Sequence, residues 1–173
     1  MADVYDEFGL LGLRPRDRIE KAMRIYQSQL KEGGDESQRW DMFLVLQATA
    51  EEVKESDQDL FNLIGKNFAT FLSTDPNGFV RHEAGFQLGY NDMHEHTSVL
   101  VASALTDEDD VVRHECVEAL GLIRYPDVDF FKKVAESDPH AGVRETANVF
   151  LKRAKRLNKA AGTKPHIISY TKG

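Results

Sequence analysis

The chain has 173 residues, of which 41% are hydrophobic and 29% are charged, a balance typical of a soluble globular protein. No apolar run approaches the roughly 20 residues needed to cross a bilayer, and the net charge of −7 argues against a general nucleic-acid binder. The single cysteine, Cys116, excludes an internal disulfide and fits a reducing compartment. The first residues also lack the basic-first order of a secretory signal, so we expect a cytoplasmic protein.

The N-terminal segment, residues 1–58, is predicted to be helical. A stretch that begins at Pro15 carries apolar residues at helical spacing, and proline is well tolerated in the first turn of a helix. Gly33 and Gly34 end this helix, and a second amphipathic stretch follows them. We therefore expect N-terminal helices ahead of the rest of the chain.

Residues 59–157 contain a segment that occurs three times. The copies read DPNGFVRHEAGFQLGYNDM from Asp75, DEDDVVRHECVEALGLIRY from Asp107 and DPHAGVRETANVFLKRAKR from Asp138, and they start 32 and 31 residues apart. Each copy has a tight turn and then a helix opened by Val-Arg, and another amphipathic stretch precedes each turn. No segment alternates apolar and polar residues with a period of two, so no strand is predicted. The sequence therefore predicts an all-α fold, an α-solenoid of about three regular helix pairs plus the N-terminal helices.

This pattern resembles HEAT-like repeats, in which an Asp in the turn is followed by Val-Arg, small residues and Ala-Leu-Gly. The resemblance covers residues 60–156. Residues 39–41, Arg-Trp-Asp, stand where Arg-His-Glu stands later, so we interpret residues 1–58 as a candidate degenerate repeat. The resemblance also implies a ladder that belongs to the scaffold, formed by Arg81, Arg113 and Arg144 with Asp75, Asp107 and Asp138.

Two of the three repeats place a His-Glu pair directly after Val-Arg, as His82-Glu83 and His114-Glu115. The third repeat has Glu145-Thr146 there, so the scaffold does not require His-Glu, which favours a chemical role over a surface inherited with the repeat. Equivalent residues on stacked helices lie about 8–10 Å apart. Two imidazoles from neighbouring helices could therefore share a metal with a carboxylate, and two His plus a carboxylate are ligands typical of non-haem Fe(II).

Tandem His-Glu dipeptides that open the second helices of HEAT-like repeats resemble deoxyhypusine hydroxylase. Members of that family carry four such dipeptides, two in each of two similar halves, around a non-haem di-iron centre that activates O₂ and hydroxylates a modified lysine of a translation factor. This chain carries two in register and so resembles one half. The resemblance implies that His82, His114 and Glu115 bind iron, and that Glu83 lies close by as a catalytic group or as a contact to the amine of the substrate.

The four side chains of the two dipeptides are too few for two irons, which need about six protein ligands. We expect a homodimer that faces two half-sites across a two-fold axis, with a single iron per chain as the alternative. The predicted function is then an iron-dependent monooxygenase that acts on an amine-bearing substrate such as a deoxyhypusine-type lysine. A metal-free HEAT-like scaffold that binds a protein partner, or a subunit similar to the HEAT-like bilin lyases, stays open as the alternative.

Several other groups have ordinary interpretations. His94-Glu95-His96 is out of register with the dipeptides and is interpreted as loop surface or as part of a substrate mouth. Cys116 stands at the position of a small core residue. The basic stretch Lys152–Lys164 is expected to be a solvated helix end, more than an RNA-binding patch. The tail, residues 158–173, is interpreted as flexible or as an arm that binds a partner.

Overall fold

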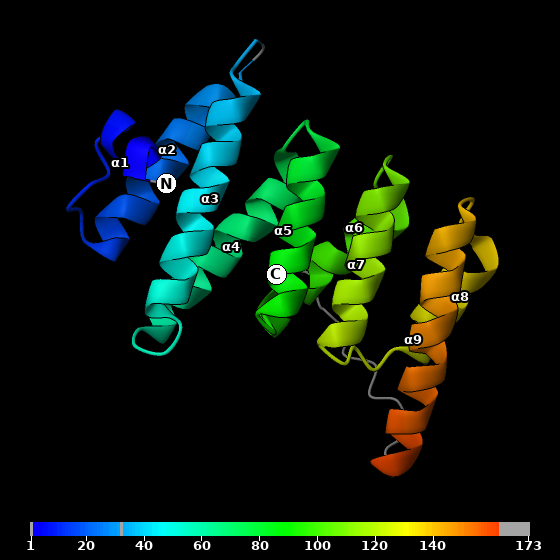
Figure 1. Ribbon diagram of the computed structural model, residues 1–173. Helices are drawn as coiled ribbons and strands as arrows, with labels where there is room; N and C mark the ends of the chain where they lie inside the picture. Colours follow the sequence, from blue (N-terminus) through cyan, green and yellow to red (C-terminus); the bar gives the residue numbers. More distant parts are fainter. Residues whose placement is uncertain (1, 32, 163–173) are drawn as a thin grey trace, which may run out of the picture.

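A computed structural model describes residues 2–31 and 33–162 (Figure 1). Within these ranges the chain forms helices and no strand, as the sequence predicts. The elements are α1 (Ala2–Glu7), α2 (Pro15–Gln29), α3 (Glu36–Val53), α4 (Gln58–Thr74), α5 (Gly78–Tyr90), the 3₁₀ helix η1 (His94–His96), α6 (Thr97–Thr106), α7 (Asp110–Leu122), α8 (Val128–Ser137) and α9 (Ala141–Ala160).

The start of most helices is set by a side chain that caps the free backbone N–H groups of the first turn. α2 begins instead with Pro15, where a missing N–H does least harm. In α3, α4, α5, α7 and α8 the cap is a short Asp or Asn side chain that accepts a hydrogen bond from a first-turn amide: Asp35, Asp57, Asn77, Asp109 and Asp127.

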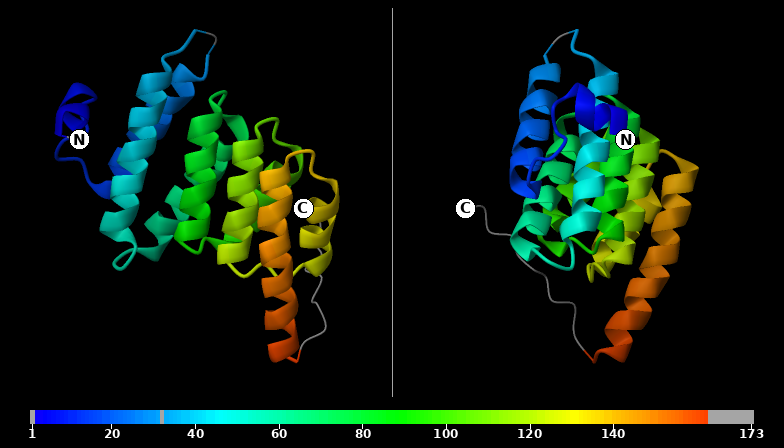
Figure 2. Two further views of the ribbon diagram at one scale, coloured as in Figure 1. Left: turned by 45° about the vertical axis from the view of Figure 1, so that its right-hand side comes forward. Right: turned by 60° about the vertical axis from the view of Figure 1, so that its left-hand side comes forward.

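The helices pair as α4 with α5, α6 with α7 and α8 with α9, and the pairs stack side by side into a solenoid (Figures 1 and 2). The second helices α5, α7 and α9 form one layer, and α3 continues it toward the N-terminus. Glycine permits the close packing of α5 on α7, because a Cβ on Gly89 would lie only 2.6 Å from the Cα of Ala119. The all-α solenoid predicted from the repeats is confirmed.

An ion-pair ladder runs through the turns that open the second helices. In every rung an arginine donates to the carboxylate of the aspartate in the following repeat, and each side chain is 10% exposed or less. Each arginine also donates to backbone carbonyls of its own turn. The rungs are Arg39–Asp75 at 3.0 Å, Arg81–Asp107 at 2.8 Å and Arg113–Asp138 at 2.8 Å.

The predicted ladder is therefore present for Arg81 and Arg113, with Arg39 as an addition and Arg144 as an exception. Arg39 of α3, 42 residues before Arg81, forms a rung through its Nε and donates through its Nη1 to the carbonyls of Gln29 and Gly34. Arg144 donates to the carbonyl oxygens of Asp138 and Pro139 at 2.7 and 2.8 Å, and no carboxylate of the described residues pairs with it. The ladder thus ends with an arginine that lacks the usual aspartate.

Three further expectations can be compared with the described residues. Cys116 is fully buried in the core, and burial raises the pKa of its thiol, as expected for a packing residue. α9 continues through residues 158–160, which the sequence assigned to the tail, while residues 163–173 of that tail lie outside the described residues. In the part of the chain that is described, no helix is both long and apolar enough to span a membrane.

Candidate metal centre

The His-Glu dipeptides lie in the first half of two neighbouring helices, His82-Glu83 in α5 and His114-Glu115 in α7. Because α5 and α7 are neighbours in the layer of second helices (Figure 1), the repeat brings the two dipeptides side by side. The side chains of His82 and Glu83 are about a quarter exposed, whereas that of Glu115 is 9% exposed. The dipeptides thus lie where a layer of packed helices meets an open surface.

His82 bridges two carboxylates. Its Nε2 lies 3.2 Å from Glu115 Oε2 on the neighbouring helix, and its Nδ1 lies 3.2 Å from Glu83 Oε1. The structure therefore brings together three of the four side chains selected from the sequence. A cluster of one imidazole and two carboxylates offers nitrogen and oxygen donors, which suit iron among the transition metals.

Burial raises the pKa of Glu115, because a charged carboxylate loses its hydration inside the protein. The negative charges of Glu118 and Glu83 raise this pKa further, and the nearby His82 imidazole opposes the shift. Three carboxylates therefore share a small volume. Such a concentration of negative charge favours a cation, whether a metal ion or an amine.

His114 has other partners than His82, Glu83 and Glu115. Its Nδ1 lies 2.9 Å from the hydroxyl of Thr146 in α9, and its Nε2 lies 3.6 Å from Glu118 Oε2 one turn further along α7. Across residues 2–31 and 33–162, no three His, Cys, Asp or Glu side chains are placed to hold a metal ion. The set His82, His114 and Glu115 is thus not assembled, and its role as a ligand set stays a prediction.

Both histidines follow one rule of register. Each histidine contacts the neighbouring second helix, at the residue that occupies the Glu position of the His-Glu pair in the following repeat. His82 contacts Glu115, and His114 contacts Thr146. The third repeat therefore ends the series with a neutral hydroxyl in place of a carboxylate. In the sequence Thr146 is only a departure from His-Glu, and its contact with His114 is not predicted.

Glu118 is the second residue that the sequence analysis missed. It follows His114 by four residues, a spacing that places two side chains on the same face of a helix, and this signal was available in the sequence. The equivalent position in α5 is Phe86. Because Glu118 occurs in only one of the two repeats, it is not part of the pattern that they share.

Exposed apolar side chains surround the dipeptides on the same face of the helices, which we call the second-helix face. They recur three residues before each His and four or eight residues after it, so they lie on the helix side that carries the His. Phe86 and Tyr90 stack on each other with ring centroids 5.5 Å apart. The set is Phe79, Phe86 and Tyr90 of α5, Val111 and Leu122 of α7, and Val149 of α9, which are 37–62% exposed.

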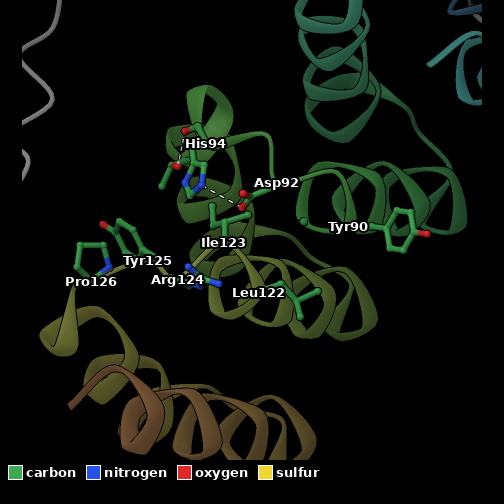
Figure 3. A pocket seen from close by; sticks show the side chains of 10 residues that line it. Tyr90, Asp92, His94, Leu122, Ile123, Arg124, Tyr125 and Pro126 are labelled. Carbon is green, nitrogen blue, oxygen red and sulfur yellow. Dashed lines mark hydrogen bonds and ion pairs between the residues drawn. The ribbon is translucent and has the colours of Figure 1, made fainter. Parts of the chain in front are cut away.

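His94 and His96 take separate roles. His94 pairs with Asp92 at 3.0 Å and lines a pocket of about 530 Å³ between the carboxyl-terminal ends of α5 and α7 (Figure 3). His96 is partly buried, which lowers its pKa, and it packs so close to Gly65 that a Cβ there would lie 2.8 Å from its Nε2. The two rings therefore do not converge on one site, and the pocket lies apart from the His-Glu dipeptides.

Comparison with known proteins adds a family and a set of relatives. Residues 66–152 match the family described as HEAT repeats. A deoxyhypusine hydroxylase of Arabidopsis thaliana is 38% identical over 96 residues, 54% of this chain and 30% of the relative. That of Saccharomyces cerevisiae is 30% identical over 110 residues, 62% of this chain and 34% of the relative. That of Homo sapiens is 41% identical over 73 residues, 41% of this chain and 24% of the relative.

These alignments leave much of each relative unmatched, since the chain spans about a third of their length. No solved structure matches. The HEAT match covers half of the chain, from α4 into α9, and includes both His-Glu helices. The chain therefore belongs to the HEAT-repeat family, and it is similar to deoxyhypusine hydroxylases over the repeats that carry the dipeptides.

Proposed function

We propose that this chain is a deoxyhypusine hydroxylase-like monooxygenase that uses non-haem iron. The observation that carries the proposal is the contact of 3.2 Å between His82 Nε2 and Glu115 Oε2, which joins an imidazole and a carboxylate from two successive repeats at an open surface. The relatives that match these repeats are named deoxyhypusine hydroxylases, which supports the same reaction class.

The donor atoms fit iron by their chemistry, and His82, His114 and Glu115 would hold it. The side chain of His114 is 39% exposed and is held by one hydroxyl and one distant carboxylate, so it can turn without opening the core. Iron bound there would supply the activation of O₂. Thr146 would release His114 on metal binding, and Glu118 would then lie beside the ligands.

The substrate group of this proposal is a protonated amine. Glu83 and Glu118 are 27% and 43% exposed, and no Lys or Arg of the described residues pairs with either carboxylate. Two partly exposed carboxylates attract a cation and hold it by charge-assisted hydrogen bonds. Glu83 would thus position the amine so that the neighbouring C–H bonds face the iron ligands.

The proposal includes a homodimer. One chain offers half of the ligands that two irons need. The exposed apolar side chains of the second-helix face surround the dipeptides, and such a set is typical of a surface that is covered in the working protein. Two copies related by a two-fold axis across this face would bury these side chains and bring two half-sites together.

The test is iron binding by the full chain, reconstituted with Fe(II) without oxygen and then freed of loose metal. We expect about one iron per chain, in keeping with three protein ligands, and loss of most of it in His82→Ala and His114→Ala. His94→Ala is the matched control, because His94 is exposed and pairs with Asp92 outside the dipeptides. Sedimentation of the loaded protein should give a dimer.

A hydroxylation assay with a deoxyhypusine-bearing protein, O₂ and a reductant then tests the reaction by the gain of one oxygen atom in the product. Wild-type protein that binds no iron, with His82→Ala still binding a partner protein as well as wild type, would contradict the proposal and favour a metal-free scaffold. A strict monomer that holds two irons would contradict the dimer alone.

A further inference from the structure

The end of the solenoid carries a surface that the internal repeats use for stacking. In α5 one stripe of the helix faces α7: a Cβ on Gly85 would meet Cys116 Sγ at 3.4 Å, and Gly89 packs on Ala119. The equivalent stripe of α7 faces α9, where Gly121 lies directly against the ring of Phe150. Each stripe starts at the ladder arginine and continues at spacings of four residues, so it is a defined face of every second helix.

In α9 the same stripe is polar and cationic. It consists of Arg144, Asn148, Lys152, Lys155 and Lys159, spaced by four, four, three and four residues, and all but the partly buried Arg144 are exposed. No Asp or Glu occurs between residues 146 and 162, although the whole chain has a net charge of −7. α9 forms one end of the stack, and its last turns extend beyond the neighbouring helices (Figure 2).

The first residue of this stripe is the arginine at which the ladder ends. Arg144 donates through Nη1 to the carbonyls of Asp138 and Pro139, as Arg81 and Arg113 do in their own turns. In those two rungs Nε and Nη2 hold both oxygens of one aspartate, at 2.8–3.1 Å. The turn orients Arg144 in the same way. Its Nε and Nη2, which we call its fork, nevertheless have no carboxylate partner among the described residues.

We propose that this stripe of α9 binds an acidic segment of a partner protein, with one carboxylate held by Arg144 and others paired with Lys152, Lys155 and Lys159. The rungs within the chain show that such an arginine donates to both oxygens of an aspartate from a turn. A further repeat of the internal type does not fit this surface, because the positions filled by glycine or valine in α5 and α7 are Asn148 and Lys152 here.

A carboxylate partner suits the stripe better than nucleic acid does. The fork of Arg144 is set for one planar carboxylate, and the rest of the chain is acidic enough to repel a polyanionic backbone that extends past α9. A short acidic segment of a protein, in contrast, can bind along the stripe without extending past α9. Charge complementarity therefore selects a short acidic protein segment.

The experiment measures binding of a fluorescein-labelled oligoglutamate peptide to the full chain by fluorescence anisotropy at low salt. In Lys152→Glu/Lys155→Glu we expect binding to weaken about tenfold, because two attractive charges become repulsive. Lys132→Glu/Lys133→Glu is the matched control, since these exposed lysines of α8 give the same change in net charge off the stripe. We expect less than about a twofold change in this control.

Arg144→Lys tests the open rung separately, because it keeps the charge and removes the fork. We expect binding about threefold weaker than wild type, with circular dichroism confirming that the variant is folded. Equal weakening by the α8 control, or tighter binding of an oligouridylate of equal charge, would overturn the proposal. Wild-type affinity in Arg144→Lys would overturn the role of the ladder arginine.

Discussion

Arg81 and His82 are consecutive residues of α5, yet they belong to two regions with opposite character. On the turn side, Arg39, Arg81 and Arg113 are buried, and each pairs with the aspartate of the following repeat. On the second-helix face, the histidines are partly exposed and their partners differ, since His82 meets Glu115 and His114 meets Thr146. The three internal rungs are saturated by the chain itself, whereas the His-Glu side keeps polar groups available to an outside ligand.

Loss of a ladder arginine should have the largest effect on folding. Arg39→Ala leaves the Asp75 carboxylate, whose side chain is 0% exposed, without its partner. We expect the free energy of unfolding to fall by about 3 kcal/mol, because an unpaired buried charge is costly. Urea denaturation measures this effect. Arg14→Ala, which breaks an ion pair of a mostly exposed arginine, should not change the unfolding midpoint; equal effects of the two would contradict the distinction.

Close helix packing should rank second. Gly89→Ala forces a methyl group against the Ala119 backbone, and we expect unfolding to become easier by about 2 kcal/mol, as for other overpacked interfaces. Gly142→Ala is the matched control in α9, because its Cβ would first meet His140 at 3.4 Å, an ordinary contact. Gly142→Ala should keep or raise the thermal stability, because alanine forms helices more readily than glycine. An equal loss in both variants would contradict close packing against Ala119 as the reason for Gly89.

Substitutions in the dipeptides should have the smallest effect on stability. His82→Ala and His114→Ala are expected to change the unfolding free energy of the metal-free protein by less than about 1 kcal/mol, because both side chains are partly exposed. The same variants should lose iron. Urea denaturation again measures the effect on stability. A loss of stability as large as that of Arg39→Ala would mean that the dipeptides have a structural role, and it would contradict the contrast between the two regions.

Much of the fold could be predicted because repetition and helical periodicity are local signals. The Asp-turn, the Val-Arg opening and the apolar spacing specify each helix pair, and stacking follows because one pair cannot bury its own apolar face. The rung made by Arg39 was harder to find. Its turn has Gly33 where the later repeats have their ladder aspartate, and the insertion ahead of Arg81 hides the period.

The candidate site could be predicted only in part. Register places His82 and Glu115 on adjacent helices, and the structure brings them into contact. The direction of His114 was not accessible, because it depends on a hydroxyl contributed by α9 and on Glu118 one turn away. The rotamer of His114 depends on partners from both α7 and α9, so it is fixed only when these helices pack together.

The sequence by itself determined the helix pairs, their stacking order and the two dipeptides that stand apart from the scaffold, since these depend on spacing along one chain. Only the tertiary structure decided which carboxylates share the space around His82, that the apolar side chains near the dipeptides stay exposed, and that Nε and Nη2 of Arg144 have no carboxylate partner among the described residues. These features depend on the distances between side chains of different repeats, which local spacing does not specify.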